Sequence, residues 1–93
     1  MKELLFTNPV FHSGTNLTVR HGRKWHLEPR ALILGKVYEL ETKLKIFFEI
    51  TDADLEQEHD PACRTVDGLF KVLSEVYPGF SRNAEVTFVT FNY

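Results

Sequence analysis

The chain has 93 residues, of which 43% are hydrophobic and 13% aromatic, which excludes a disordered chain and predicts one domain over residues 1–93. The formal net charge of −2 excludes the overall basic excess that is typical of nucleic-acid proteins. Cys63 is the single cysteine, so no disulfide can form within the chain, and a reducing compartment is indicated. No long apolar run and no signal peptide are found, and we expect a cytoplasmic protein that does not span a membrane.

The charge is distributed unevenly along the chain. Residues 20–30 carry four basic side chains and one acid, a local balance of +3, whereas residues 49–60 carry six acids and no lysine or arginine. A domain that keeps these segments apart has a positive and a negative side. The basic segment suits contact with RNA, and the acidic segment suits a basic protein partner. Each also suits an ordinary solvated surface.

Two strands are predicted near the N-terminus. Glu3–Thr7 is short, mostly apolar and followed by the turn signal Asn8-Pro9. Leu17–Arg20 alternates apolar and polar residues and predicts the second strand. Because side chains alternate along a strand, Thr18 and Arg20 share one face of it.

The middle of the chain predicts a loop and two further strands. Residues 21–30 contain glycine and proline and predict a basic loop. Ala31–Leu40 is rich in Leu, Ile, Val and Tyr and predicts a long strand, bent at Gly35 as at a barrel corner. A turn near residues 41–43 and a strand at Leu44–Phe48 follow.

Two helices are predicted in the second half. The first covers about residues 51–59, where Thr51 and Asp54 form the two ends of a capping box. The second covers about residues 65–77 and ends at Pro78-Gly79. Its apolar residues recur at helical spacing and form one stripe that requires a sheet to pack on: Val66, Leu69, Phe70, Leu73, Val76 and Tyr77.

The C-terminal segment Glu85–Tyr93 is β-branched and aromatic with apolar residues on both faces, which predicts a central strand. About five strands with two helices indicate an α+β fold, a small mixed β-pseudobarrel. Neither a glycine-rich phosphate loop nor a nucleophile elbow is present, so we expect no cofactor. A metal site from Glu58, His59 and Cys63 is disfavoured, because Asp60-Pro61 breaks their shared helical face and no second ligand pair exists.

Four segments carry a family resemblance: the strand Leu17–Arg20, the acidic Glu56–Glu58, the helix end Val76–Phe80 and the final strand Val86–Phe91. In their order and spacing the chain resembles the ASCH family, small pseudobarrel domains related to the PUA RNA-binding domain, over most of its length. The resemblance implies a PUA-like pseudobarrel that binds RNA or a modified nucleoside.

Within that family the chain is most similar to the short single-domain type of the acetylcytidine amidohydrolases. The resemblance implies a Lys–Thr–Glu catalytic group whose threonine attacks the N-acetyl carbonyl. By position the threonine is Thr18 and the glutamate Glu58, and Arg20 matches an arginine two residues after the threonine. The lysine position holds Thr15, which cannot act as the base that a threonine nucleophile needs. Lys24 and Lys36 are the alternatives that we consider for that role.

The basic loop supplies further candidate ligand-binding residues. Trp25 lies beside Arg23 and Lys24, and an aromatic ring among cations is the arrangement that stacks on a base and contacts phosphate. An ordinary core tryptophan is the alternative. We therefore expect binding of RNA or a modified nucleoside, with amide hydrolysis on an acetylated pyrimidine nucleoside or a protein-interaction module as alternatives.

Overall fold

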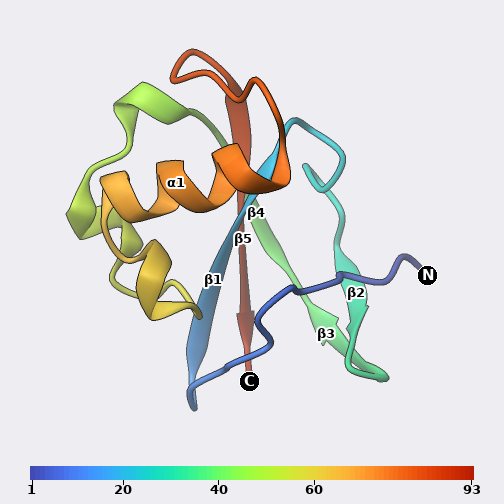
Figure 1. The fold of residues 1–93 in the computed structure, drawn as a ribbon. Helices are drawn as coiled ribbons and strands as arrows, with labels where there is room; N and C mark the ends of the chain where they lie inside the picture. The colour runs from blue at the N-terminus through green and yellow to red at the C-terminus, as the bar shows by residue number, and fades with distance from the viewer.

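Five antiparallel strands in two sheets and one α-helix make up the fold in the computed structural model, which describes residues 1–93 (Figure 1). The strands are β1 (Thr15–His21), β2 (Arg30–Ile33), β3 (Lys36–Glu39), β4 (Glu41–Ile46) and β5 (Glu85–Asn92). The helix α1 spans Val66–Val76, and three short 3₁₀ turns lie at Phe47–Glu49, Asp52–Leu55 and Pro61–Cys63. None of the helices has the length and apolar character that crossing a membrane requires.

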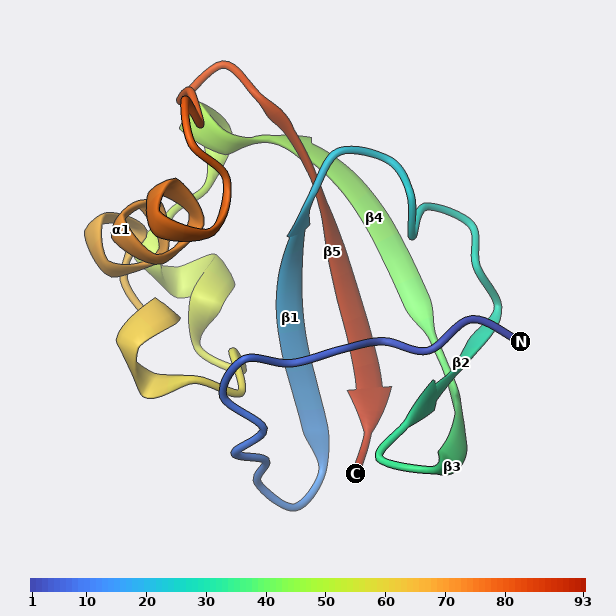
Figure 2. The same ribbon diagram turned by 45° about the vertical axis from the view of Figure 1, so that its right-hand side comes forward.

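The larger sheet has the order β1-β5-β4, so β5 is the central strand, as predicted (Figure 2). Both of its neighbours pair with it in antiparallel register, with Thr18 opposite Val89. β5 is apolar on both faces because a layer covers each face of the sheet. β1 is an edge strand, and its free edge positions the site described below.

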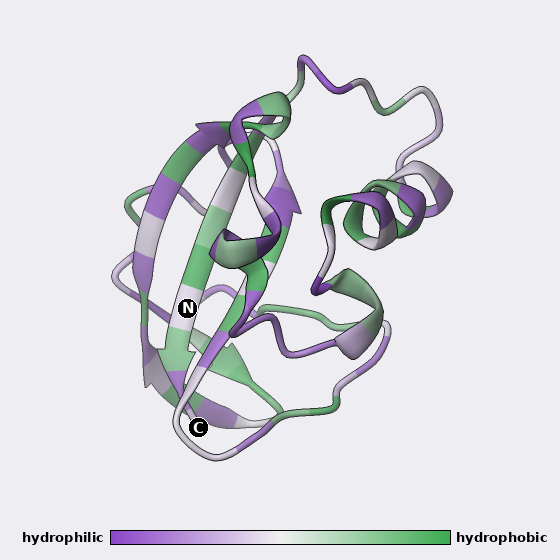
Figure 3. Cartoon of the chain, turned by 90° about the vertical axis from the view of Figure 1, so that its left-hand side faces the viewer, coloured by the Kyte–Doolittle hydropathy of each residue, from purple (hydrophilic) through white to green (hydrophobic).

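The two covering layers define two cores. On one face, Leu17 and Val19 of β1 pack with the buried α1 residues Leu69 and Leu73. On the other face, Val89 and Phe91 of β5 pack with Leu4, Trp25, Ala31 and Ile33 from the N-terminal segment, the basic loop and β2. Hydrophobic and hydrophilic residues accordingly alternate in bands along the strands in Figure 3.

The helix α1 forms as predicted. Thr65 caps it, since its side-chain oxygen accepts a hydrogen bond from the N–H of Gly68 at 3.1 Å. The side chain of Asp52 accepts a second bond from the N–H of Val66 at 2.7 Å. The chain leaves the helix through Gly79, whose φ of 82° suits glycine.

The predicted helix at residues 51–59 is wrong. The structure has a single 3₁₀ turn, Asp52–Leu55, although the predicted capping bond from the N–H of Thr51 to Asp54 is present at 3.0 Å. Four acids within this segment repel one another, and it lacks an apolar stripe that would hold a longer helix on the sheet. Residues 57–59 instead run beside β1, where Gln57 and His59 bond to the backbone of Leu17.

The predicted long strand Ala31–Leu40 is also wrong: β2 and β3 form a two-stranded hairpin that turns at Gly35, whose φ is 82°. Gly35 therefore reverses the chain instead of bending one strand. The predicted turn near residues 41–43 lies inside β4, and Glu3–Thr7 contributes one isolated bridge, from Glu3 to Leu32, in place of a strand. The two sheets do not close into a barrel.

Candidate functional site

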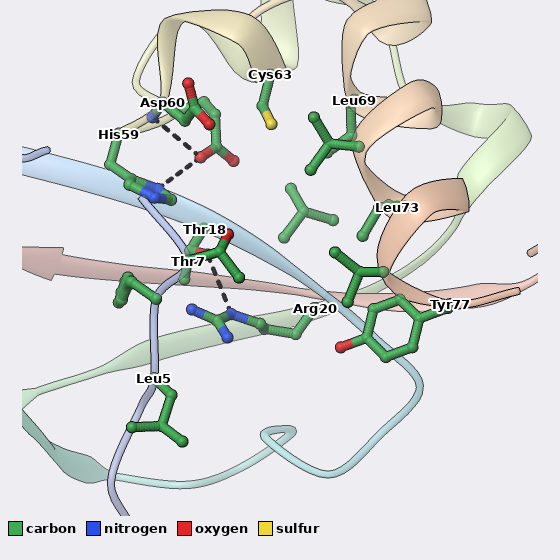
Figure 4. A pocket seen from close by; sticks show the side chains of 15 residues that line it. Leu5, Thr7, Thr18, Arg20, His59, Asp60, Cys63, Leu69, Leu73 and Tyr77 are labelled. Atoms are coloured by element: carbon green, nitrogen blue, oxygen red, sulfur yellow. Dashed lines mark hydrogen bonds and ion pairs between the residues drawn. The ribbon is translucent and has the colours of Figure 1, made fainter. Parts of the chain in front are cut away.

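A cavity of about 90 Å³ lies at the free edge of β1, between the N-terminal segment and α1 (Figure 4). Three candidate residues predicted from the sequence line it. Thr18 and Arg20 come from β1, and Glu58 comes from the segment that follows the 3₁₀ turn Asp52–Leu55. The opposite wall is apolar and is formed by residues of α1 with Cys63. The cavity is therefore polar on the strand side and hydrophobic on the helix side, as small-molecule sites usually are.

Thr18 and Arg20 interact directly along one face of β1. The Nε of Arg20 donates a hydrogen bond to Oγ1 of Thr18 at 3.1 Å, and the guanidinium lies 4.7 Å from the ring centroid of Phe6. The Thr18 side chain is buried, and its hydroxyl hydrogen remains available because the oxygen is the acceptor in this bond. The strand and Phe6 thus hold the arginine in place.

The terminal nitrogens of Arg20 have no hydrogen-bond acceptor or ion-pair partner in the protein. Burial lowers the pKa of Arg20, and Tyr77 and Glu58 offset part of that effect. Figure 4 shows the Tyr77 ring beside the Arg20 side chain, with its hydroxyl directed toward it. A half-buried guanidinium with free N–H groups can donate hydrogen bonds to a carbonyl, carboxylate or phosphate oxygen.

Glu58 is held by backbone pairing between its segment and the edge of β1. The N–H of Leu17 donates to the carbonyl of Gln57 at 2.8 Å, and the N–H of His59 donates to the carbonyl of Leu17 at 2.9 Å. The residue is 1% exposed, yet its carboxylate lines the cavity. Its Oε2 has no protein partner and is not fully enclosed, so it faces the cavity.

His59 is a cavity residue that sequence reasoning missed. Its Nδ1 lies 2.6 Å from Oε1 of Glu58 and 3.2 Å from the carbonyl oxygen of Leu17, and its ring meets Phe6 edge-on. Burial lowers the pKa of His59, but the hydrogen bond and charge of Glu58 outweigh it, and the net pKa is raised. The only sequence feature that points to His59 is its position directly after Glu58. In the sequence that position suggests a metal site and no other role.

Cys63 forms part of the apolar wall. Burial raises the pKa of its thiol to about 12, and the nearby carboxylates of Glu58 and Asp60 add to the effect. The thiol is therefore protonated and packs as a small hydrophobic group beside Leu69.

The basic loop lies outside this cavity. Trp25 is 6% exposed and belongs to the second core, so the core alternative holds and its ring is not free to stack on a base. Arg23 is exposed and forms a bidentate ion pair with Glu85, whose nearest contact is 2.8 Å. Lys24 lines a second hollow of about 200 Å³, which shares Leu5, Arg20 and Tyr77 with the cavity.

No lysine lines the cavity. Lys24 lines the neighbouring hollow, and Lys36 is an exposed residue of β3 at the hairpin. Neither lysine therefore lines the cavity with Thr18, where the resemblance implies a lysine.

Most carboxylates of the acidic segment 49–60 accept hydrogen bonds from backbone N–H groups. Five of its six acids accept a hydrogen bond from a backbone N–H, Glu56 being the exception: Glu49, Asp52, Asp54, Glu58 and Asp60. These bonds satisfy backbone groups at the starts of short turns and of α1, which accounts for the local accumulation of acids.

Comparisons with protein-family models, with curated proteins and with solved structures found no match for this chain.

Proposed function

We propose that the chain binds a nucleoside, or an unpaired base at the end of an RNA, with the polar edge of the base in the cavity beside β1. One observation carries the proposal: Thr18 and Arg20 of β1 meet Glu58, which comes from a separate segment, in one cavity. The side chains supply a donor–acceptor hydroxyl, free guanidinium N–H groups and a carboxylate oxygen. These are the groups that read the polar edge of a base.

The size of the cavity limits what can enter it. The cavity of about 90 Å³ is smaller than the roughly 150 Å³ cavity that holds a benzene molecule, so it admits the polar edge of a base and not a whole nucleoside. The neighbouring hollow gives room for the remainder of the ligand and exposes it to Lys24. A long single-stranded RNA is less favoured than a nucleoside, because Trp25 is buried and Arg23 is neutralised by Glu85.

The order of segments that resembles ASCH domains supports the same proposal. We infer that the chain is a divergent ASCH-type domain of PUA-like ancestry, in which the β2–β3 hairpin lies across one face of the sheet and leaves the barrel open. The meeting of Thr18 and Glu58 in a cavity is what that relationship requires.

Calorimetric titration with cytidine, uridine, adenosine and N4-acetylcytidine tests the proposal, at 50 mM and at 300 mM salt. Arg20→Met should weaken binding tenfold or more, since hydrogen bonds to a charged group contribute about 1.5–3 kcal/mol. Arg30→Met is the matched control. Arg30 is exposed in β2, so this substitution removes the same charge outside the cavity. No binding by any of the four nucleosides, or equal losses in the two variants, contradicts the proposal.

Amide hydrolysis is the second candidate function, favoured by the Glu58–His59 pair in the same cavity as Thr18. In that reaction the Thr18 oxygen attacks the acetyl carbon, its proton passes to a base, and the protonated amine leaves before water releases acetate. Apart from Arg20, His59 is the basic side chain in the cavity, where the resemblance implies a lysine.

Incubation with N4-acetylcytidine followed by chromatography for cytidine separates the two candidates. Release of cytidine by the native chain, and loss of that release in Thr18→Val, support hydrolysis. Tight binding without release supports a binding module, and release that is unchanged in Thr18→Val contradicts a threonine nucleophile.

A further inference from the structure

The backbone of β1 alternates in the direction of its hydrogen-bonding groups. Gly14 and Tyr93 exchange both of their hydrogen bonds, at 3.3 and 2.9 Å, and the N–H of Gly22 donates to Glu85 at 2.8 Å. In an antiparallel pair such bonded positions recur at every second residue. Positions 16, 18 and 20 therefore bond to β5, whereas positions 17, 19 and 21 direct their N–H and C=O groups to the free edge.

These outward groups meet three different surroundings. At Leu17 they are paired with Gln57 and His59, in the bonds that hold Glu58. At Val19 no protein group pairs with them, because the chain turns away from β1 after His59 into the 3₁₀ turn Pro61–Cys63. His21 is exposed, so its outward groups can bond to water.

Val19 is 6% exposed and lines the cavity. Its N–H and C=O are thus a donor and an acceptor with no protein partner, at a position that bulk water reaches poorly. Buried backbone groups in folded proteins are nearly always paired with protein or ordered water, so these two groups are open to water or to a ligand in the cavity. A ligand in the cavity can take the place of the next strand at these two groups.

We propose that the main chain of Val19 pairs with the ligand, an inference that rests on the proposed binding function. The N–H and C=O of one extended residue point to the same side, so their partner must present an acceptor and a donor next to each other in one plane. The amide or amidine edge of a pyrimidine base has this pattern. The cavity therefore selects compounds with such an edge, and the free N–H groups of Arg20 lie beside the same strand for a further oxygen of the ligand.

NMR titration of the ¹⁵N-labelled chain tests this pairing at one atom. Uridine is compared with 3-methyluridine, and cytidine with N4,N4-dimethylcytidine, because each methylated compound has lost the donor of its edge. We expect the unmodified nucleoside to shift the Val19 amide resonance and to slow its hydrogen exchange. The methylated partner should bind at least tenfold more weakly.

The possible failures are distinguishable. If none of the four compounds binds, the proposed function is wrong. If a nucleoside binds without perturbing the Val19 amide, or the methylated partner binds equally well, the binding function stands and the main-chain pairing is wrong.

A proline substitution gives a second test. Val19→Pro removes the outward N–H without removing a β1–β5 bond, and proline is tolerated at such positions of edge strands. Val19→Ala keeps the N–H but loses side-chain volume. We expect Val19→Pro to weaken binding at least tenfold and Val19→Ala less than threefold, in chains whose folding is checked by circular dichroism. Equal losses contradict the pairing, and the titration of the native chain decides the question if Val19→Pro does not fold.

Discussion

The Nδ1 atom of His59 lies 2.6 Å from Oε1 of Glu58, and both side chains line the cavity that contains the hydroxyl of Thr18. The bond fixes the tautomer of the neutral ring, since Nδ1 must carry the proton that it donates to the carboxylate. It leaves the second carboxylate oxygen open to the cavity. A carboxylate and an imidazole held in this way can orient a ligand or carry a proton.

Glu58→Gln should lower the pKa of His59. Burial already acts to lower this pKa, and the charge that overcomes it is the one that the substitution removes. The measurement is an NMR pH titration of the His59 ring. Glu56→Gln is the matched control, because Glu56 is an exposed acid two residues earlier in the same segment. An unchanged His59 pKa in Glu58→Gln means that the carboxylate does not set it.

The pair also makes the stability of the chain depend on pH. The folded pKa of His59 is above its unfolded value of about 6.5, so protonated His59 stabilises the fold fully below that value. This contribution is lost as the pH rises through the folded pKa. In urea unfolding, the free-energy difference between the native chain and His59→Gln, on the order of 1–3 kcal/mol at low pH, should shrink as the pH rises. A difference that grows with pH contradicts this account.

The parts of the site that the sequence predicts are those that depend on residues close together in the chain. Thr18 and Arg20 are two residues apart on a strand, so their common face follows from the alternation of side chains. Glu58 was linked to them through the order of segments that resembles ASCH domains. Its actual support, the backbone pairing of residues 57–59 with Leu17, is a contact between segments 42 residues apart that no local pattern records.

Contacts between distant segments also determine the surroundings of other predicted residues. Trp25 stands among basic residues, but its surroundings in space are Leu4, Ala31 and Ile33, which the sheet brings together. Arg23 is neutralised by Glu85, which lies 62 positions later in the chain. Gly35 predicts a bend within one strand but forms a hairpin turn, since glycine suits a bulge and a hairpin turn equally well. α1 was predicted well because its cap, apolar stripe and termination all lie within one short stretch.

Cys63 should react slowly with thiol reagents in the folded chain. Burial, with the carboxylates of Glu58 and Asp60, raises the pKa of its thiol from 9.0 to about 12, and the thiolate is the reactive form. At pH 8 the rate with iodoacetamide should be roughly a hundredfold or more lower than in the urea-unfolded chain. Mass spectrometry of timed samples measures both rates. A folded rate within tenfold of the unfolded rate shows instead that the cavity wall opens readily.

Gly68→Ala should destabilise the fold, although alanine is the better helix former by about 1 kcal/mol. A Cβ at this position would overlap the backbone carbonyl oxygen of Ala62, in the 3₁₀ turn against which α1 packs. Overpacking costs about 1–3 kcal/mol, so we expect a net loss of roughly 1 kcal/mol in urea unfolding. Lys71→Ala, at an exposed position one turn later, should change stability by less than about 0.5 kcal/mol. If Gly68→Ala instead stabilises the chain, α1 can move away from this turn at little cost, and the apolar wall of the cavity is not rigid.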